Sequence, residues 1–300
     1  IHCGLVGSEM CIRDSSKIFF TSSDFWPSFL FAANQLNIST VLTSARYRKS
    51  YNIFLKMFNK IFCVSNDDYH QIKMNISNDK IYKIGNPRYD RILKNLENFE
   101  YKLDSSRQDE GNILIFASMW DEDNKIIFEK FINSPLVNHF KKVIIVPHEV
   151  NDYYLNYYCS VLEDNDFSFK KINQYQNFNQ FEEKYIIVNK VGFLSKLYAQ
   201  STITYVGGGF SKSGIHNIIE PAAASNPVIF GSNFLNSNKS DAEGLIDVSG
   251  GFSVDSYELF TEKINWLLDK NNYNNSSKNC KSFVTENSGS TEKILKELYE

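Results

Sequence analysis

Short runs of β-branched and aromatic residues recur along the chain and are separated by amphipathic segments, a pattern typical of buried strands alternating with helices. The expected strands are residues 17–20, 38–43, 61–65, 80–84, 112–117, 142–147, 167–172, 185–189, 202–206, 227–230 and 251–254. The expected helices are residues 24–35, 49–59, 67–75, 121–131, 153–162, 193–199, 241–247, 256–269 and 280–300, the last with a break at Gly289. This alternation predicts an α/β fold with parallel, doubly wound sheets.

The most informative stretch, residues 202–231, reads as strand, glycine loop, helix and strand. Gly207, Gly208 and Gly209 remove every Cβ where the chain leaves the sheet, which permits close approach of a ligand. Backbone N–H groups ahead of a helix that starts near His216 would form an anion site. A tight turn explains the same glycines without any ligand, and their spacing matches neither GxGxxG nor a phosphate loop.

Asn217 and Glu220 have a structural interpretation as well, because they fit the N-cap and N3 positions of a capping box. Polar segments are expected to be exposed: residues 97–111 as a linker or loop, and residues 271–275 as an Asn-rich loop.

Several motifs in this order resemble those of the bacterial 3-deoxy-D-manno-octulosonate (Kdo) transferases, which are lipid A glycosyltransferases. The glycine stretch resembles the donor-binding segment of that family. The other matching motifs are DFWP at 24–27, SAR at 44–46, GNPRYD at 85–90, ASMWDE at 117–122, VPHE at 146–149 and VGFLS at 191–195.

The resemblance implies a GT-B architecture of two Rossmann-like domains, with Gly85–Asp90 as a hinge. It implies inverting transfer of Kdo from CMP-Kdo to a lipid A precursor, with neither a cofactor nor an obligatory metal. It also implies work at the cytoplasmic face of the bacterial inner membrane, with the membrane surface as a further partner.

The same resemblance leads us to expect an incomplete N-terminal domain. Residues 1–15 look like a non-native leader, residues 16–96 like the rear part of the acceptor-side domain, and residues 97–300 like the donor-binding domain. The family's proposed catalytic base, a Glu in a Gly-Glu element, has no counterpart in residues 1–16. We therefore name no catalytic residue and expect a fragment that binds donor without turnover.

By resemblance, the donor site gathers residues from several strand ends and from the glycine stretch. Its expected members are Ser118, Pro147, His148, Gly192, Phe193, Leu194, Gly207, Gly208, Gly209, His216, Asn217 and Glu220. Glu220 suits the ribose, because a carboxylate accepts two hydroxyl hydrogen bonds. His148 stands where relatives often have Arg and lacks the guanidinium fork, so it is equally well explained as a solvated loop histidine.

Other members of this set have structural explanations too. His216 and Glu220 have a spacing that could ligate a metal, but two ligands make a poor site, so no metal is expected. Phe193 fits the core of an ordinary turn, and Ser118 fits an exposed strand end. Asp24 and Arg46 are expected to face the acceptor side of the cleft, where Arg46 would pair with a carboxylate or phosphate and Asp24 is equally an N-cap.

Composition narrows the function classes. Hydrophobic content of 42% and charged content of 22% are typical of a globular protein, and a net charge of −3 argues against nonspecific nucleic-acid binding. The five cysteines are scattered without metal spacing, as a reducing cytoplasm would leave them, and Cys63 and Cys159 are expected in the core. There is no apolar run long enough for a transmembrane helix.

Two other functions fit the same residues. The glycine loop and Glu220 do not specify a base, so another GT-B transferase or an epimerase that uses a UDP-sugar is an alternative. A nucleotide-binding module without turnover is the second.

Overall fold

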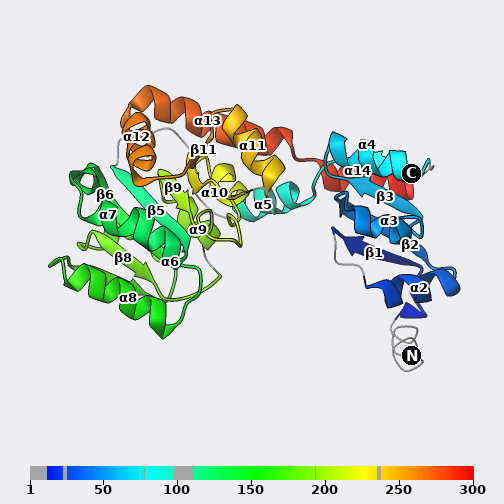
Figure 1. Cartoon of the computed structure of the whole chain (residues 1–300), viewed down its shortest axis with the longest axis horizontal. Coiled ribbons are helices and arrows are strands. Elements are labelled where there is room, and N and C mark those ends of the chain that lie inside the picture. Colours follow the sequence, from blue (N-terminus) through cyan, green and yellow to red (C-terminus); the bar gives the residue numbers. More distant parts are fainter. Residues whose placement is uncertain (1–11, 23–25, 77–78, 98–110, 193, 235–237) are drawn as a thin grey trace. The chain divides into compact units, whose positions relative to one another are not determined.

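The computed structural model describes residues 12–22, 26–76, 79–97, 111–192, 194–234 and 238–300, and these divide into two compact units. Unit 1 comprises residues 1–91 and 287–300, and unit 2 comprises residues 92–286. Both contain parallel sheets with helices (Figure 1). The α/β prediction is confirmed.

Unit 1 is built on a four-stranded parallel sheet in the order β1-β2-β3-β4. The strands are β1 (Lys17–Thr21), β2 (Ser39–Ala45), β3 (Lys60–Cys63) and β4 (Ile81–Lys83). The helical segments are α2 (Pro27–Gln35), η1 (Lys49–Tyr51), α3 (Asn52–Leu55), α4 (Asn66–Asn75) and α5 (Arg88–Glu97), which continues into unit 2. One core contains Phe20, Leu42 and the buried thiol of Cys63, as expected.

The C-terminal helix α14 (Ser290–Tyr299) belongs to unit 1. Its Ile294 packs in a cluster with Val41 and Phe62 of the sheet. Residues 97–300 were expected to form one domain, but α14 belongs to unit 1, where this amphipathic helix buries its apolar side. Ile12, from the segment left out of the fold prediction, is also buried in unit 1, against Ala32 and Ala33.

Unit 2 is built on a seven-stranded parallel sheet in the order β11-β10-β9-β5-β6-β8-β7. The strands are β5 (Asn112–Met119), β6 (Phe140–Pro147), β7 (Phe169–Ile172), β8 (Tyr185–Val188), β9 (Ile203–Val206), β10 (Val228–Gly231) and β11 (Gly251–Val254). The chain runs outward from β5 to β6 on one side and from β9 to β10 on the other. The strand order therefore reverses between β5 and β9, and open α/β sheets bind ligands outside the carboxyl ends of strands at such a point.

Helices cover both faces of this sheet (Figure 1). They are α6 (Asp121–Asp123), the π-helical turn η3 (Asn124–Phe128), α7 (Glu129–Ile132), η4 (Pro135–His139), α8 (Asp152–Glu163), η5 (Phe178–Gln180), α9 (Leu194–Tyr198), α10 (Ile219–Ala223), α11 (Lys239–Asp247), α12 (Tyr257–Leu268) and α13 (Lys270–Glu286). Along β5, Leu114 and Phe116 enter one core cluster while Ile113 and Ile115 enter the other. Burial on both faces explains why the strands read as continuous apolar runs.

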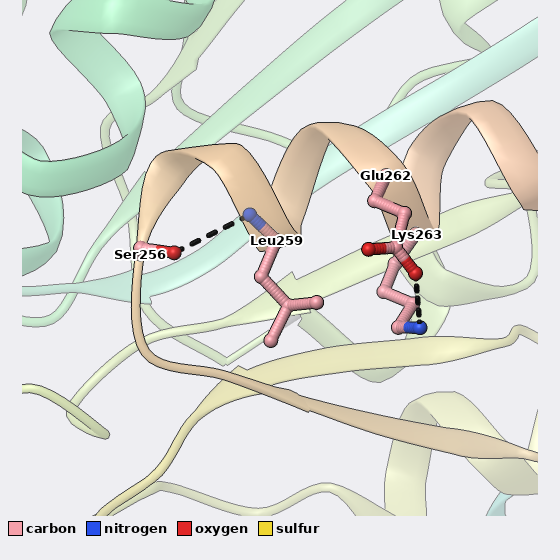
Figure 2. Close-up of polar contacts among 4 residues, drawn as sticks. All are labelled: Ser256, Leu259, Glu262 and Lys263. Carbon is pink, nitrogen blue, oxygen red and sulfur yellow. Dashed lines mark hydrogen bonds and ion pairs between the residues drawn. The ribbon is translucent and has the colours of Figure 1, made fainter.

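Two helices of unit 2 show how local capping sets their starts. Ser256 Oγ accepts a hydrogen bond from the Leu259 N–H at 3.3 Å, which caps α12, and Lys263 pairs with Glu262 on the exposed side (Figure 2). Asp269 Oδ1 accepts from the N–H groups of Asn271 and Asn272, both at 3.0 Å, and starts α13.

The loop expected at residues 271–275 is therefore wrong. These residues are the first turns of α13, whose buried side chains include Tyr273, Ser276, Cys280 and Val284. Their spacing of three or four residues is helical, and the packing of this stripe outweighs the weak helix propensity of the asparagines.

The helix expected from His216 begins three residues later, at Ile219. The break expected at Gly289 is confirmed, since Gly289 has a φ of 83° and precedes α14. The helix predicted at residues 24–35 is described from Pro27, and Asp24 lies outside the described residues. Within the described part of the chain, no helix combines the length and apolarity needed to span a membrane.

The start of α14 gives a prediction on stability. Both carboxylate oxygens of Asp90 are used there: Oδ1 accepts from the Gly289 N–H at 2.5 Å, and Oδ2 accepts from the Thr291 N–H at 2.6 Å. Asp90→Ala removes both acceptors at the positive end of the helix, so we expect a loss of about 1–2 kcal/mol in the free energy of unfolding. Urea denaturation and hydrogen exchange at Thr291 measure the loss.

Two further variants serve as controls. Asp90→Asn keeps one oxygen acceptor and should lose less stability. Asp67→Ala removes an exposed carboxylate from the first turn of α4 and should stay within about 0.5 kcal/mol of the wild type. Equal stability of Asp90→Ala and Asp67→Ala would contradict the prediction.

Candidate functional site

The carboxyl ends of β5, β6 and β9 meet where the strand order of unit 2 reverses. Ser118 lies near the end of β5, at a register shift between Ala117 and Met119. Its φ of 56° is unusual for a non-glycine residue, and strained backbone of this kind concentrates at functional sites. The His148 N–H donates to the Met119 carbonyl at 3.0 Å, which joins the end of β6 to that of β5.

The three glycines after β9 are buried, and the protein's own backbone explains them. A Cβ on Gly207 would lie 2.4 Å from the Ser118 carbonyl oxygen, and one on Gly209 would lie 2.5 Å from Gly231. Gly208 has a φ of 94°, which a side chain would strain. These glycines are thus required by the close approach of neighbouring strand ends.

Two of the glycine amides already have acceptors inside the protein. The Gly207 N–H donates to the Ala117 carbonyl at 2.8 Å, and the Gly208 N–H donates to Asp123 Oδ2 at 2.8 Å. The expectation that these two amides serve a bound anion is therefore not supported by their geometry.

Asp123 is the fully buried carboxylate that fixes this region. Its Oδ2 accepts from the Gly208 N–H and from the Trp120 N–H at 3.1 Å, and its Oδ1 accepts from the Tyr205 hydroxyl at 2.6 Å. Burial raises the pKa of Asp123, and the three hydrogen bonds oppose that rise. The side chain of the last residue of the short helix α6 thereby holds β9 and the glycine loop against the end of β5.

Trp120, His148 and His216 form a compact aromatic group beside the glycine loop. The Trp120 indole Nε1–H donates to His216 Nε2 at 2.6 Å, and the planes of these two rings differ by only 3°. The His148 ring stacks on both, with centroid separations of 4.1 Å from Trp120 and 4.3 Å from His216. Burial lowers the pKa of both histidines, that of His216 to about 4 with His148 as the second cause.

A cavity of about 110 Å³ opens beside His148. We call it the strand-end cavity. Its lining residues are Ser118, Val146, Pro147, His148, Val150, Val188, Lys190, Val191, Gly192, Leu194 and Leu197. The wall is mainly apolar with a few polar groups, which is the usual makeup of a small-molecule site.

Glu220 lines a second, smaller cavity of about 40 Å³ with Ser195 and residues of α5. Its side chain is half-buried, and its Oε1 accepts from Asn217 Nδ2 at 2.7 Å. Asn217 Oδ1 accepts from the Ile219 N–H at 3.1 Å. The expected capping box is replaced by this side-chain pair, because the N-cap residue of α10 is Ile218.

The structure brings most of the expected donor-site residues together in unit 2. Those that line the strand-end cavity are Ser118, Pro147, His148, Gly192 and Leu194. Those in or beside the glycine loop are Gly207, Gly208, Gly209 and His216, while Asn217 and Glu220 follow at α10. Phe193 and Asp24 lie outside the described residues.

Arg46 belongs to unit 1, directly after β2. Ser44, two residues earlier, has a φ of 53° at a register shift and donates its hydroxyl to Asn86 Oδ1 at 3.3 Å. The chain turns at Ser44 and leaves the sheet after Ala45. The half-buried Arg46 is the next residue.

Sequence reasoning missed the roles of Trp120 and Asp123. The sequence did contain a signal for them: a Trp followed by three acidic residues comes directly after a strand that was predicted correctly. Which acidic residue turns inward depends on the donors supplied by β9, and these come from residues more than eighty positions away. Among the described residues, no group of three His, Cys, Asp or Glu side chains could hold a metal ion.

Curated proteins similar to this chain include Kdo transferases. A 3-deoxy-D-manno-octulosonic acid transferase of Chlamydia trachomatis is 26% identical over 299 residues, covering 93% of this chain and 67% of the relative. The resemblance to Kdo transferases is confirmed. A bifunctional glycosyltransferase/methyltransferase of Fusobacterium nucleatum is 25% identical over 285 residues, covering 90% of this chain and 43% of the relative. The chain thus spans 43% of the length of one of these relatives and 67% of the other.

Solved structures support the GT-B fold. A glycosyltransferase from Rickettsia africae matches with a TM-score of 0.56 at 16% identity, covering 99% of this chain and 80% of the other. UDP-GlcNAc 2-epimerase from Neisseria meningitidis, bound to UDP-GlcNAc, matches with a TM-score of 0.67 at 12% identity and the same coverage. No family model matches the chain.

The buried Asp123 gives a prediction on stability. Asp123→Ala leaves the Gly208 and Trp120 amides and the Tyr205 hydroxyl without their acceptor, so we expect a loss of about 2–4 kcal/mol in the free energy of unfolding. Asp123→Asn keeps an oxygen for the two amides, and its NH₂ can donate to the Tyr205 oxygen, so it should lose less. Tyr205→Phe removes one bond only. An Asp123→Ala protein as stable as Tyr205→Phe in urea denaturation would contradict this role.

The lowered pKa of His216 predicts a pH dependence of stability. The folded value is about 4 against an ordinary 6.5, so between these values the unfolded chain binds a proton that the folded protein excludes. Stability should therefore fall as the pH drops from 6.5 towards 4, by about 1–2 kcal/mol because the ring is partly solvated. Urea denaturation at pH 6.5 and pH 4 measures the difference.

Two variants, one at the half-buried His216 and one at an exposed histidine, isolate the contribution of His216 to the pH dependence of stability. His216→Gln should remove that share of the pH dependence, whereas the exposed His139→Gln should retain it. Asp123, whose pKa is raised, contributes in the opposite sense and is unchanged in both variants. Equal pH dependence in His216→Gln and the wild type would assign the effect to other groups.

Proposed function

We propose that unit 2 binds CMP-Kdo and that the protein takes part in the transfer of Kdo to a lipid A precursor. The observation that carries the proposal is the strand-end cavity, where Ser118, His148 and Gly192 line one space at the carboxyl ends of β5, β6 and β8, and β5 borders the point where the strand order reverses. Similarity to Kdo transferases over 93% of the chain supports the choice of donor. On this proposal the protein works at the cytoplasmic face of the inner membrane.

The strand-end cavity suits the base of the nucleotide. Its volume of about 110 Å³ and its apolar walls of Val146, Val188 and Leu194 fit a single flat ring. Ser118, His148 and Lys190 supply polar groups at its edge. Because the pKa of His148 is lowered by burial, the ring is neutral at pH 7 and offers one donor and one acceptor to the base.

Glu220 is the residue that we assign to the ribose. Its carboxylate lines the neighbouring cavity, and Asn217 orients it by donating to Oε1. A carboxylate is an acceptor with several lone pairs, which suits it to the hydroxyl groups of a ribose. The segment between these two sites, which includes the exposed Lys212, is left for the phosphate and the sugar acid.

In the proposed reaction, the acceptor hydroxyl attacks the anomeric carbon of Kdo and CMP departs with the bonding electrons. A base takes the hydroxyl proton. Negative charge grows on the departing phosphate, so donors and cations around the glycine segment would stabilise the transition state more than the ground state. On the acceptor side, Arg46 is the proposed partner for a carboxylate or phosphate.

Isothermal titration of the full chain with CMP and UMP tests the proposal. We expect CMP to bind more tightly than UMP, and Glu220→Ala to weaken CMP binding by about tenfold or more, as for the loss of hydrogen bonds to a charged group. Glu243→Ala, an exposed carboxylate on α11, is the matched control and should bind like the wild type. Absence of CMP binding, or equal affinity for UMP, would refute the choice of donor.

A further inference from the structure

The hydrogen bond between Trp120 and His216 determines which nitrogen of the histidine carries the proton. The two rings are nearly coplanar, 3° apart, and meet edge to edge with the indole Nε1 at 2.6 Å from His216 Nε2. His148 lies across one face of both rings, at interplanar angles of 19° and 22°. The His216 ring is thereby held in its plane by Trp120 and against rotation by His148.

The direction of the hydrogen bond follows from the chemistry of the partners. An indole N–H can only donate, so His216 Nε2 must offer its lone pair. A neutral imidazole that accepts at one nitrogen carries its proton on the other, here Nδ1. A doubly protonated ring would set two N–H groups against each other, which agrees with the pKa of about 4 that burial and His148 give His216.

The surroundings show which way the remaining donor points. His216 Cδ2 faces the glycine loop, since a Cβ on Gly208 would lie 3.1 Å from it. Nδ1 is on the opposite side of the imidazole from Cδ2, so its N–H points away from that buried loop. This N–H is a neutral donor on the segment that joins the glycine loop to Asn217 and Glu220.

We propose that Trp120 is a positioning residue that holds His216 as the Nδ1–H tautomer, so that His216 donates this hydrogen to the phosphate of the bound nucleotide. The assignment of the tautomer depends only on the ring geometry. The contact with phosphate depends on the proposed function, because it needs a nucleotide in the site. A phosphate oxygen is purely an acceptor in this contact, so a ring with the proton on Nε2 would face it with a lone pair.

Nitrogen-15 NMR of the labelled full chain at pH 7.5 tests the tautomer directly. Signals that disappear in His216→Gln identify the ring. We expect a protonated Nδ1 and an unprotonated Nε2 in the wild type, and in Trp120→Phe a shift of the proton towards Nε2. The phenyl ring keeps an aromatic face for His148 but has no N–H. A wild-type ring protonated at Nε2, or an unchanged tautomer in Trp120→Phe, would overturn the assignment.

Titration of the same samples with CMP tests the ligand contact. In the wild type the His216 Nδ1–H resonance should shift on saturation, and Trp120→Phe should bind CMP about tenfold more weakly. The control is Trp266→Phe, because Trp266 packs on Phe252 at 5.4 Å, away from the aromatic group, and should leave the tautomer and the affinity unchanged.

The outcomes separate this inference from the proposed function. If CMP binds and the Nδ1–H resonance does not move, the contact with phosphate is wrong while the donor assignment stands. If CMP does not bind the wild type, the proposed function fails together with that contact. The tautomer is then decided by the NMR spectra of the free protein. If Trp120→Phe fails to fold, the spectrum of the wild type alone shows which ring nitrogen of His216 is protonated.

Discussion

The carboxylate of Asp123 is the interaction on which the candidate site depends. It has no exposed surface and accepts hydrogen bonds from β9, from the glycine loop and from the backbone at Trp120. A buried carboxylate is unfavourable unless donors surround it, so its presence enforces one arrangement of these three segments. The aromatic group and the strand-end cavity both adjoin the chain that this carboxylate fixes, and their geometry is a consequence of it.

The fold could be predicted from the sequence because its strands are buried on both faces. Runs such as residues 112–117 and 142–147 are apolar throughout, and their order with intervening helices allowed few topologies. The hydrophobic pattern also placed Gly207 at a strand end, because an apolar run stops there, whereas Ser118 and His148 were named from the resemblance to Kdo transferases. Such patterns identify the edge of the sheet at which the candidate site lies.

The features that could not be predicted depend on partners distant in sequence. Helix α13 begins in an asparagine-rich stretch whose local preference is for a loop, and only the burial of Tyr273 and Cys280 makes it a helix. Helix α14 packs on unit 1 through Ile294, and Asp90, about two hundred positions earlier, accepts hydrogen bonds from the N–H groups at its start. Likewise, the Trp120 N–H is the local donor to Asp123, and the two other donors come from Tyr205 and Gly208, more than eighty positions away.

The two units use the same backbone device at corresponding places. In unit 1 the strand β2 shifts register at Ser44, and in unit 2 the strand β5 shifts register at Ser118, each with a left-handed φ. Such irregularities redirect the residues that follow them, and serine tolerates this backbone less well than glycine does. In one case the chain then leads to Arg46, and in the other to Trp120. In each sheet a serine with a left-handed backbone near the end of a strand thus stands two residues before a candidate residue, at the point where the chain leaves the sheet.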